Sequence, residues 1–231
     1  MTIEELNNRI ISCKLCPRLA KYREAVARNP PKRFRGQAYW AKPLPGFGDV
    51  KGRVLVLGLA PAAHGGNRTG RMFTGDSSGD TLVKALHRAG FANMDRSVSR
   101  DDGLVLKDVY VTAVVRCAPP DNKPAKQEVE NCLPYLIEEL RMLENVVVVV
   151  ALGRIAFETF FRLMRRMNAY TGRMPRFRHG AVYRLKGSFN GRPLPTVIAS
   201  YHPSRQNTNT GRLTQRMIDS VFHRARAIVC S

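Results

Sequence analysis

The chain of 231 residues is long enough to bury one continuous hydrophobic core without disulfide bonds. Apolar residues make up 44% of it and charged residues 24%, which excludes a disordered, collagen-like or coiled-coil protein. The charge is unusual, because 38 lysines and arginines against 18 acidic residues leave a formal net charge of +20. This excess indicates a polyanionic partner.

The first 50 residues predict a short helix followed by a basic arm. Thr2 and Glu5 have the spacing of a capping box, and apolar residues recur at helical spacing behind them, so the helix should end near Cys13. Between Lys14 and Lys42 there are nine basic residues and one acidic residue, together with several prolines. We expect this arm to be mostly irregular and to pack on the core.

The rest of the chain alternates predicted strands with predicted helices. Short runs rich in β-branched residues predict strands over residues 53–59, 108–115, 146–152, 181–185 and 196–200. Amphipathic patterns predict helices over residues 76–90, 126–143, 153–167 and 211–229. Alternation of this kind is typical of an α/β fold with a mainly parallel sheet. Since no repeat interrupts the pattern, we expect a single domain over residues 1–231.

Charge and hydropathy along the chain narrow the class of protein further. From Thr159 to Ile218 there is no acidic residue, against twelve lysines and arginines, so this part of the surface should be strongly positive. The longest uninterrupted apolar run, Val146 to Leu152, is far shorter than the roughly 20 residues that span a bilayer. The first residues, MTIEE, do not read as a secretory signal. We therefore expect a cytoplasmic protein.

Three loops that follow predicted strands carry the candidate site. The first runs from Gly58 to Asp76 and holds five glycines, but it lacks both the dinucleotide-binding G-x-G-x-x-G order and the G-K-[ST] of a phosphate-binding loop. The second contains Asn122, and the third contains His202. Ligands of parallel sheets bind beyond the carboxyl ends of the strands, where these loops should lie. The other histidines are interpreted as structural: His64, His87, His179 and His223.

Four of the five cysteines form two pairs in the sequence. Cys13 and Cys16 have C-x2-C spacing, Cys117 and Cys132 lie further along, and Cys230 is left over. The odd number argues against a disulfide framework. Four thiolates can close a tetrahedral zinc site or hold a [4Fe-4S] cluster, and the spacing alone does not choose between them. Four buried structural thiols remain an alternative.

Together these motifs resemble the uracil-DNA glycosylase superfamily, and in particular its family 5, the type-B enzymes of thermophilic prokaryotes. The resemblance covers nearly the whole chain and rests on GLAPA at 58–62, GRMFTGD at 70–76, YHPS at 201–204 and the four paired cysteines. It implies a four-stranded, mainly parallel sheet flanked by helices. It also implies a structural [4Fe-4S] cluster on Cys13, Cys16, Cys117 and Cys132, and base excision from DNA. We expect a monomer.

The resemblance assigns roles to individual residues. Cleavage of an N-glycosidic bond creates a cationic sugar and an anionic base, so a site needs a negative group near the sugar and a hydrogen-bond donor near the base. Asp76 corresponds to the aspartate that would orient water and stabilise the cation. His202 corresponds to the histidine that would donate to the base carbonyl. Phe73 corresponds to the aromatic residue on which the extruded base stacks.

Further residues are expected to bind the base or the duplex. An amide can satisfy the Watson–Crick edge of an extruded base, which makes Asn122 and Asn207 candidates. The segment 205–207 follows the second motif where superfamily members push a wedge into the duplex. The substrate-binding set is therefore Gly58, Leu59, Ala60, Phe73, Asn122 and Asn207. The DNA-binding set is Ser204, Arg205 and Gln206.

The chain departs from related families within the expected pocket. Leu59 and Ala60 stand where several families have an acidic or amide residue, and Ala113 stands where the similar family 4 enzymes have an asparagine. We therefore expect a less discriminating pocket that accepts uracil and other deaminated bases such as hypoxanthine, in double-stranded and also in single-stranded DNA. The alternative is a non-catalytic, metal-stabilised nucleic-acid-binding module. That alternative explains the charge and the cysteines but not the glycine-rich loop.

Overall fold

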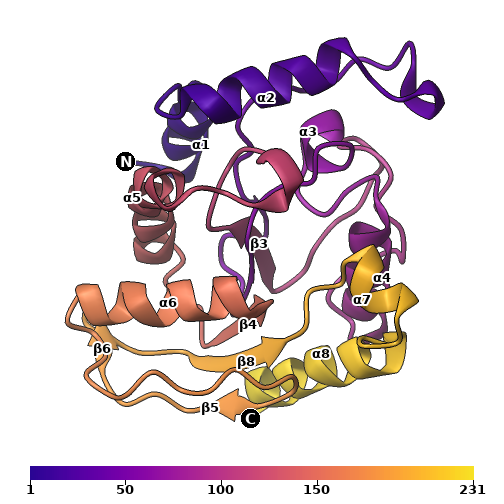
Figure 1. Ribbon diagram of the computed structural model, residues 1–231. Helices are drawn as coiled ribbons and strands as arrows, with labels where there is room; N and C mark the ends of the chain where they lie inside the picture. Colours follow the sequence, from indigo (N-terminus) through magenta and orange to yellow (C-terminus); the bar gives the residue numbers. More distant parts are fainter.

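The centre of the protein is a six-stranded mixed sheet of order β1-β3-β2-β4-β8-β5 (Figure 1). The computed structural model describes all residues, 1–231. The four inner strands run parallel: β3 (Val109–Ala113), β2 (Val54–Gly58), β4 (Val148–Leu152) and β8 (Thr196–Ser200). The two edge strands are antiparallel and two residues long: β1 (Phe47–Gly48) and β5 (Val182–Tyr183). The α/β prediction is confirmed, although the sheet has six strands rather than four.

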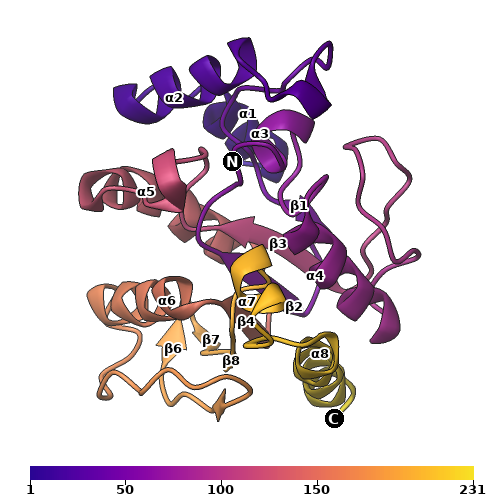
Figure 2. The ribbon, with the colours of Figure 1, turned by 45° about the vertical axis from the view of Figure 1, so that its right-hand side comes forward.

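Helices cover both faces of the sheet, as Figure 2 shows. One face packs against α5 (Lys126–Met142) and α6 (Arg154–Arg166), and the other against α4 (Ser77–Arg88) and α8 (Gln215–Cys230). Along β2, Leu55 and Leu57 point to the first face, whereas Val54 and Val56 point to the second. Because both faces are buried, the inner strands are apolar runs without polar alternation.

The N-terminal segment is more helical than its sequence predicts. Helix α1 (Ile3–Ile11) begins at the expected capping box, with Thr2 and Glu5 exchanging hydrogen bonds. The prediction of a mostly irregular basic arm is wrong, because residues Pro17–Arg28 form helix α2. Proline at the first helical position removes no donor that the helix needs. Burial of Leu19 and Arg23 then holds α2 against the body of the protein.

Short elements lie in the connections. Within the glycine-rich loop is α3 (Gly66–Thr69), and after β3 comes the 3-10 turn η2 (Pro120–Asn122). Between β8 and α8 lies α7 (Arg205–Asn209), and the remaining pieces are η1 (Lys32–Phe34), β6 (Ser188–Phe189) and β7 (Arg192–Pro193). Helix α8 starts later than predicted, because Thr214 accepts the hydrogen bond that caps it. No helix combines the length and the apolar character needed to cross a bilayer.

Candidate active site

The candidate site lies where the parallel strands end. Gly58 at the end of β2 is paired in register with Ala113 at the end of β3. Strand β8 ends at Ser200, immediately before Tyr201 and His202. The topology therefore brings the three loops that the sequence singles out to the same edge of the sheet.

Phe73 and His202 face each other across this edge. Their ring centroids are 5.9 Å apart and their planes are inclined by 34°. Phe73 has a backbone φ of +50°, which is rare for a bulky residue and frequent at functional sites. Gly58 makes room for the ring, because a Cβ at Gly58 would lie 2.9 Å from Phe73 Cζ. The structure thus joins the first and the second motif.

His202 is uncharged near neutral pH. Burial lowers the pKa of its imidazole to about 4, and no neighbouring charge contributes to the shift. The backbone carbonyl of His202 accepts a hydrogen bond of 2.8 Å from Asn207 Nδ2. A neutral imidazole can still donate one N–H to a ligand atom that gains negative charge.

Asp76 caps helix α4 with one oxygen of its carboxylate. Oδ1 accepts hydrogen bonds of 2.9 Å from the backbone N–H groups of Ser78 and Gly79, whereas Oδ2 makes no hydrogen bond within the protein. A Cβ at Gly65 would overlap Oδ2, so the carboxylate lies directly against that glycine. Burial raises the pKa of Asp76, and the two backbone N–H groups and the charge of Arg68 counteract this only in part. The second oxygen is therefore available to a water molecule or a ligand, and it is a better proton acceptor than an exposed carboxylate.

A buried ion pair fixes the segment that carries Phe73 and Asp76. Arg71 donates to the side chains of Thr74 at 3.0 Å and Ser97 at 3.1 Å, and it forms a 2.7 Å ion pair with Asp102. The same Asp102 accepts hydrogen bonds from the backbone of residues 98, 99 and 104. Sequence reasoning missed this clamp, because Asp102 lies outside every motif.

The other predicted substrate residues lie around the same edge with less defined contacts. Leu59 and Ala60 are half-buried directly after β2. Asn122 ends η2 with an exposed side chain and a φ of +56°, and its side-chain amide forms no hydrogen bond within the protein. The amide nitrogen of Asn207 is engaged with the backbone of the His202 loop. Their roles toward a base stay predictions.

The three predicted DNA-binding residues form the start of α7. Ser204 is its N-cap, and its hydroxyl accepts a hydrogen bond of 3.4 Å from the backbone N–H of Asn207. Arg205 and Gln206 are exposed on the first turn. Their positions are compatible with contact to a duplex, and that role also stays a prediction.

The four paired cysteines come from three separate segments. Cys13 follows α1, Cys16 precedes α2, Cys117 follows β3 and Cys132 lies in α5. They lie near one another: burial and the neighbouring Cys132 and Cys13 raise the pKa of Cys117 to about 12, and burial and the neighbouring Cys16 and Cys13 raise that of Cys132. All cysteines are free thiols, and no three metal-ligating side chains come close enough together to hold one metal ion.

Donors surround the sulfur atoms. Arg23 Nη1 lies 3.2 Å from Cys117 Sγ, and Asn131 Nδ2 lies 3.4 Å from Cys16 Sγ. The guanidinium of Arg23 is buried, donates to the carbonyl of Ala41 and forms no ion pair with a carboxylate. A buried cation requires an anionic partner, and the thiolates of a metal centre would supply it. The donor set therefore fits a negatively charged iron–sulfur group.

His179 has a closer relation to the site than its sequence context indicates. Its Nδ1 accepts a hydrogen bond of 3.1 Å from the backbone N–H of Tyr201, and its ring stacks on Tyr201 at 5.0 Å. Antiparallel pairing of the predicted strands 181–185 and 196–200 would have placed residue 179 beside residue 201. The sequence offered no means of knowing that these two strands pair.

The fold and this edge together define an α/β enzyme with a carboxylate, a neutral histidine and an aromatic ring at its candidate site. The family model described as the uracil DNA glycosylase superfamily matches residues 45–226. The type-5 uracil-DNA glycosylase of Thermus thermophilus is 50% identical over 95% of this chain and 94% of its own length. The type-5 enzyme of Pyrobaculum aerophilum is 46% identical over 97% of this chain and 92% of its own. A type-4 uracil-DNA glycosylase of the same organism is 35% identical over 88% of this chain and 84% of its own. The chain therefore belongs to the uracil-DNA glycosylase superfamily.

Proposed function

We propose that this DNA glycosylase hydrolyses the N-glycosyl bond of uracil in DNA and leaves an abasic site. The observation that carries the proposal is the facing pair of Phe73 and His202, which joins the two motifs at the end of the sheet. The names of the relatives support uracil as the base. A base inside a duplex is out of reach of such a site, so the nucleotide has to be everted first.

The base would stack on Phe73, with His202 at its edge. As the glycosyl bond breaks, negative charge develops on the base, and a fixed N–H donor stabilises that charge more than it stabilises the intact substrate. Because the pKa of His202 is about 4, the imidazole donates as a neutral group. It therefore acts as a hydrogen-bond donor and not as a cation.

Asp76 would serve the sugar side of the reaction. The N-terminus of α4 holds Oδ1, which leaves Oδ2 to orient a water molecule toward the anomeric carbon. Its negative charge also stabilises the oxocarbenium-like sugar. Proton uptake from the attacking water suits a carboxylate whose pKa burial has raised.

We further propose that the pocket accepts hypoxanthine. Ala113 is 2% exposed and packs with Leu44 and Met72, so no polar side chain at this position reads the base. Leu59 and Ala60 likewise offer no hydrogen-bonding side chain. A pocket that relies on stacking tolerates several bases, because every base has a π-face.

We also propose that Cys13, Cys16, Cys117 and Cys132 hold a [4Fe-4S] cluster. A cluster is wider than one ion and takes one thiolate at each of its four irons, so it does not require the four sulfur atoms to converge on a single ion. Bound there, it would cross-link α1, α2, α5 and the end of β3. The monomeric state and the cytoplasmic location stay predictions.

A strand-cleavage assay tests the proposal. End-labelled duplexes carrying one uracil or one hypoxanthine are incubated with the protein and then treated with alkali. We expect breaks at the modified base only after alkali, and a loss of about 100-fold or more in the Asp76→Asn variant with duplex binding kept. Asp80→Asn, four residues further on and exposed, is the matched control. Binding without any breaks, with iron present, would favour the non-catalytic binding module.

A further inference from the structure

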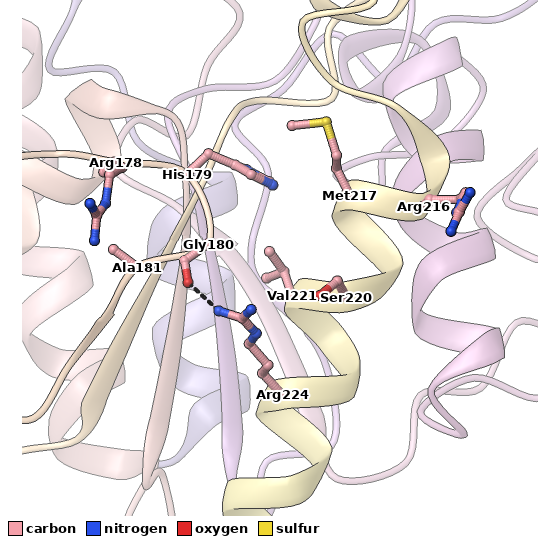
Figure 3. Close-up of a pocket in the computed structure, with 9 residues that line it drawn as sticks. All are labelled: Arg178, His179, Gly180, Ala181, Arg216, Met217, Ser220, Val221 and Arg224. Atoms are coloured by element: carbon pink, nitrogen blue, oxygen red, sulfur yellow. Dashed lines mark hydrogen bonds between the residues drawn. The ribbon is translucent and has the colours of Figure 1, made fainter.

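A groove with three arginines opens beside the candidate active site (Figure 3). One wall is the segment 178–181 that leads into β5, and the other is formed by residues 216–224 of α8. Its volume is about 520 Å³, enough for a nucleotide-sized group. The charged lining is entirely basic, with Arg178, Arg216 and Arg224 and no acidic residue.

The positive charge of the groove is not neutralised by the protein. None of its three arginines forms an ion pair. Arg224 reaches across the groove and donates one hydrogen bond of 2.7 Å to the carbonyl of Gly180, while the side chains of Arg178 and Arg216 extend outward on its two sides and donate none (Figure 3). Most of the guanidinium donors are therefore free for an anion.

The groove is continuous with the loop that carries His202. His179, in the groove wall, bonds and stacks on Tyr201, the residue before His202. On the side of α7, the guanidinium of Arg212 lies 4.8 Å from the ring centre of Tyr201. Basic side chains thus extend from Arg205 at the start of α7, past Tyr201, and into the groove.

We propose that this groove binds a backbone phosphate of the DNA strand beside the everted nucleotide. Charge complementarity and the position next to Tyr201 favour a phosphodiester over any uncharged ligand. The apolar side chains of Ala181, Met217 and Val221, which also line the groove, suit the adjoining deoxyribose. The proposal rests on the proposed function, because it takes the substrate to be DNA.

The test compares two double variants of equal charge. Arg178→Glu/Arg216→Glu reverses the sign of the charge of the groove. Because a glutamate at position 216 is favourable in the first turn of α8, the fold should be kept. The control, Arg165→Glu/Arg184→Glu, changes two exposed arginines without side-chain hydrogen bonds, at the C-terminal turn of α6 and just after β5. Both lie toward the amino-terminal ends of the parallel strands, whereas the site lies at their carboxyl ends.

Affinity is measured against salt concentration on a duplex that carries, in place of uracil, one stable abasic-site analogue, which can be everted but has no base to excise. We expect the groove variant to lose at least about tenfold in affinity, and the slope of log K against log salt to fall in magnitude by about 1, as loss of one phosphate contact requires, while the control stays close to the parent. Equal losses in both variants would overturn the proposal, because bulk charge would explain them. No loss in the groove variant would also overturn it.

Titration with inorganic phosphate separates the two sources of the anion. If the parent binds phosphate and the groove variant does not, while duplex affinity is the same in both, the groove is a site for a free anion and the proposal is wrong. Because the duplex contains no uracil, these results do not depend on excision. A parent that excises nothing would contradict the proposed function and leave the test of the groove intact.

Discussion

Burial shifts the pKa values of the two side chains at the site in opposite directions. It raises the pKa of Asp76 and lowers that of His202, because in both cases the charged form is the one that loses hydration. Hydrogen bonds from backbone N–H groups at the start of α4 counteract part of the rise in the pKa of Asp76, whereas no neighbouring charge counteracts the fall in the pKa of His202. The site therefore pairs a carboxylate with a neutral donor.

The low pKa of His202 predicts a pH dependence of stability. Between about pH 4 and pH 6.5 the unfolded chain binds a proton on this residue that the folded chain does not. The contribution of His202 to the free energy of unfolding therefore rises with pH across this window and falls on acidification. Chemical denaturation at several pH values should show a flatter profile for His202→Gln than for the parent.

His87→Gln, on the exposed side of α4, is the control and should keep the slope of the parent. Identical slopes for all three proteins would show that His202 is protonated at its ordinary pKa in the folded state.

Gly65 is predicted to position Asp76. A Cβ at Gly65 would overlap Asp76 Oδ2, so a Gly65→Ala change has to displace the carboxylate. We expect a drop in kcat of about tenfold or more with duplex affinity kept, since a displaced carboxylate misplaces the water. The readout is a double-mutant cycle with Asp76→Asn, in which the two losses should not add. Additive losses would assign Gly65 a role independent of Asp76.

At the scale of elements, the site depends on a clamp between two loops. Arg71 in the GRMFTGD segment and Asp102 in the following loop are both largely buried. Burial would raise the pKa of Asp102, but the hydrogen bonds from Arg71 and three backbone N–H groups outweigh it and lower that pKa. The clamp is therefore fully formed at neutral pH, and it weakens only as the pH falls below the usual range of a carboxyl group.

Asp102→Asn should destabilise the protein by about 3 kcal/mol, because it leaves the Arg71 cation buried without its partner. Excision should fall as well, since the same segment carries Phe73. Denaturant titration and limited proteolysis of the loop over residues 93–105 measure the effect. The adjacent Asp101 is exposed, and Asp101→Asn should leave stability within about 0.5 kcal/mol of the parent. Equal stability of the two variants would contradict a structural role for the ion pair.

At the scale of the molecule, the N-terminal helices and the sheet meet at the cysteines. Helix α1 packs against α5, and α2 is tied to the body by Arg18, which pairs with Glu128 at 2.7 Å, and by Arg23 at Cys117. A cluster on the four thiols would join these segments covalently, and metal ligation of this kind contributes directly to folding stability.

Cys117→Ser should therefore reduce bound iron and lower the midpoint of thermal unfolding by several degrees, with earlier proteolysis of α1 and α2. Iron content and melting temperature are the measurements. Cys230→Ser changes an exposed thiol at the end of α8 and should alter neither. Unchanged iron and melting temperature in Cys117→Ser would rule out this residue as a ligand.

The sequence by itself determined the α/β class, the inner strands, the main helices and the three loops of the site. These follow from local patterns, such as the β-branched run of β4 and the capping box at Thr2, which act over a few residues. The family motifs also lie in contiguous stretches, so Asp76 and His202 could be named from them. Helix α2 was missed, because the prolines around it obscured a helix that burial of Leu19 stabilises.

Only the tertiary structure decided how distant segments meet. Three contacts join residues that no local pattern connects. Phe73 faces His202, Arg71 pairs with Asp102, and His179 stacks on Tyr201. Strand order places these partners side by side, and strand order is fixed by burial of both sheet faces rather than by any single segment. The basic groove exists for the same reason, because β5 pairs with β8 and α8 packs beside them.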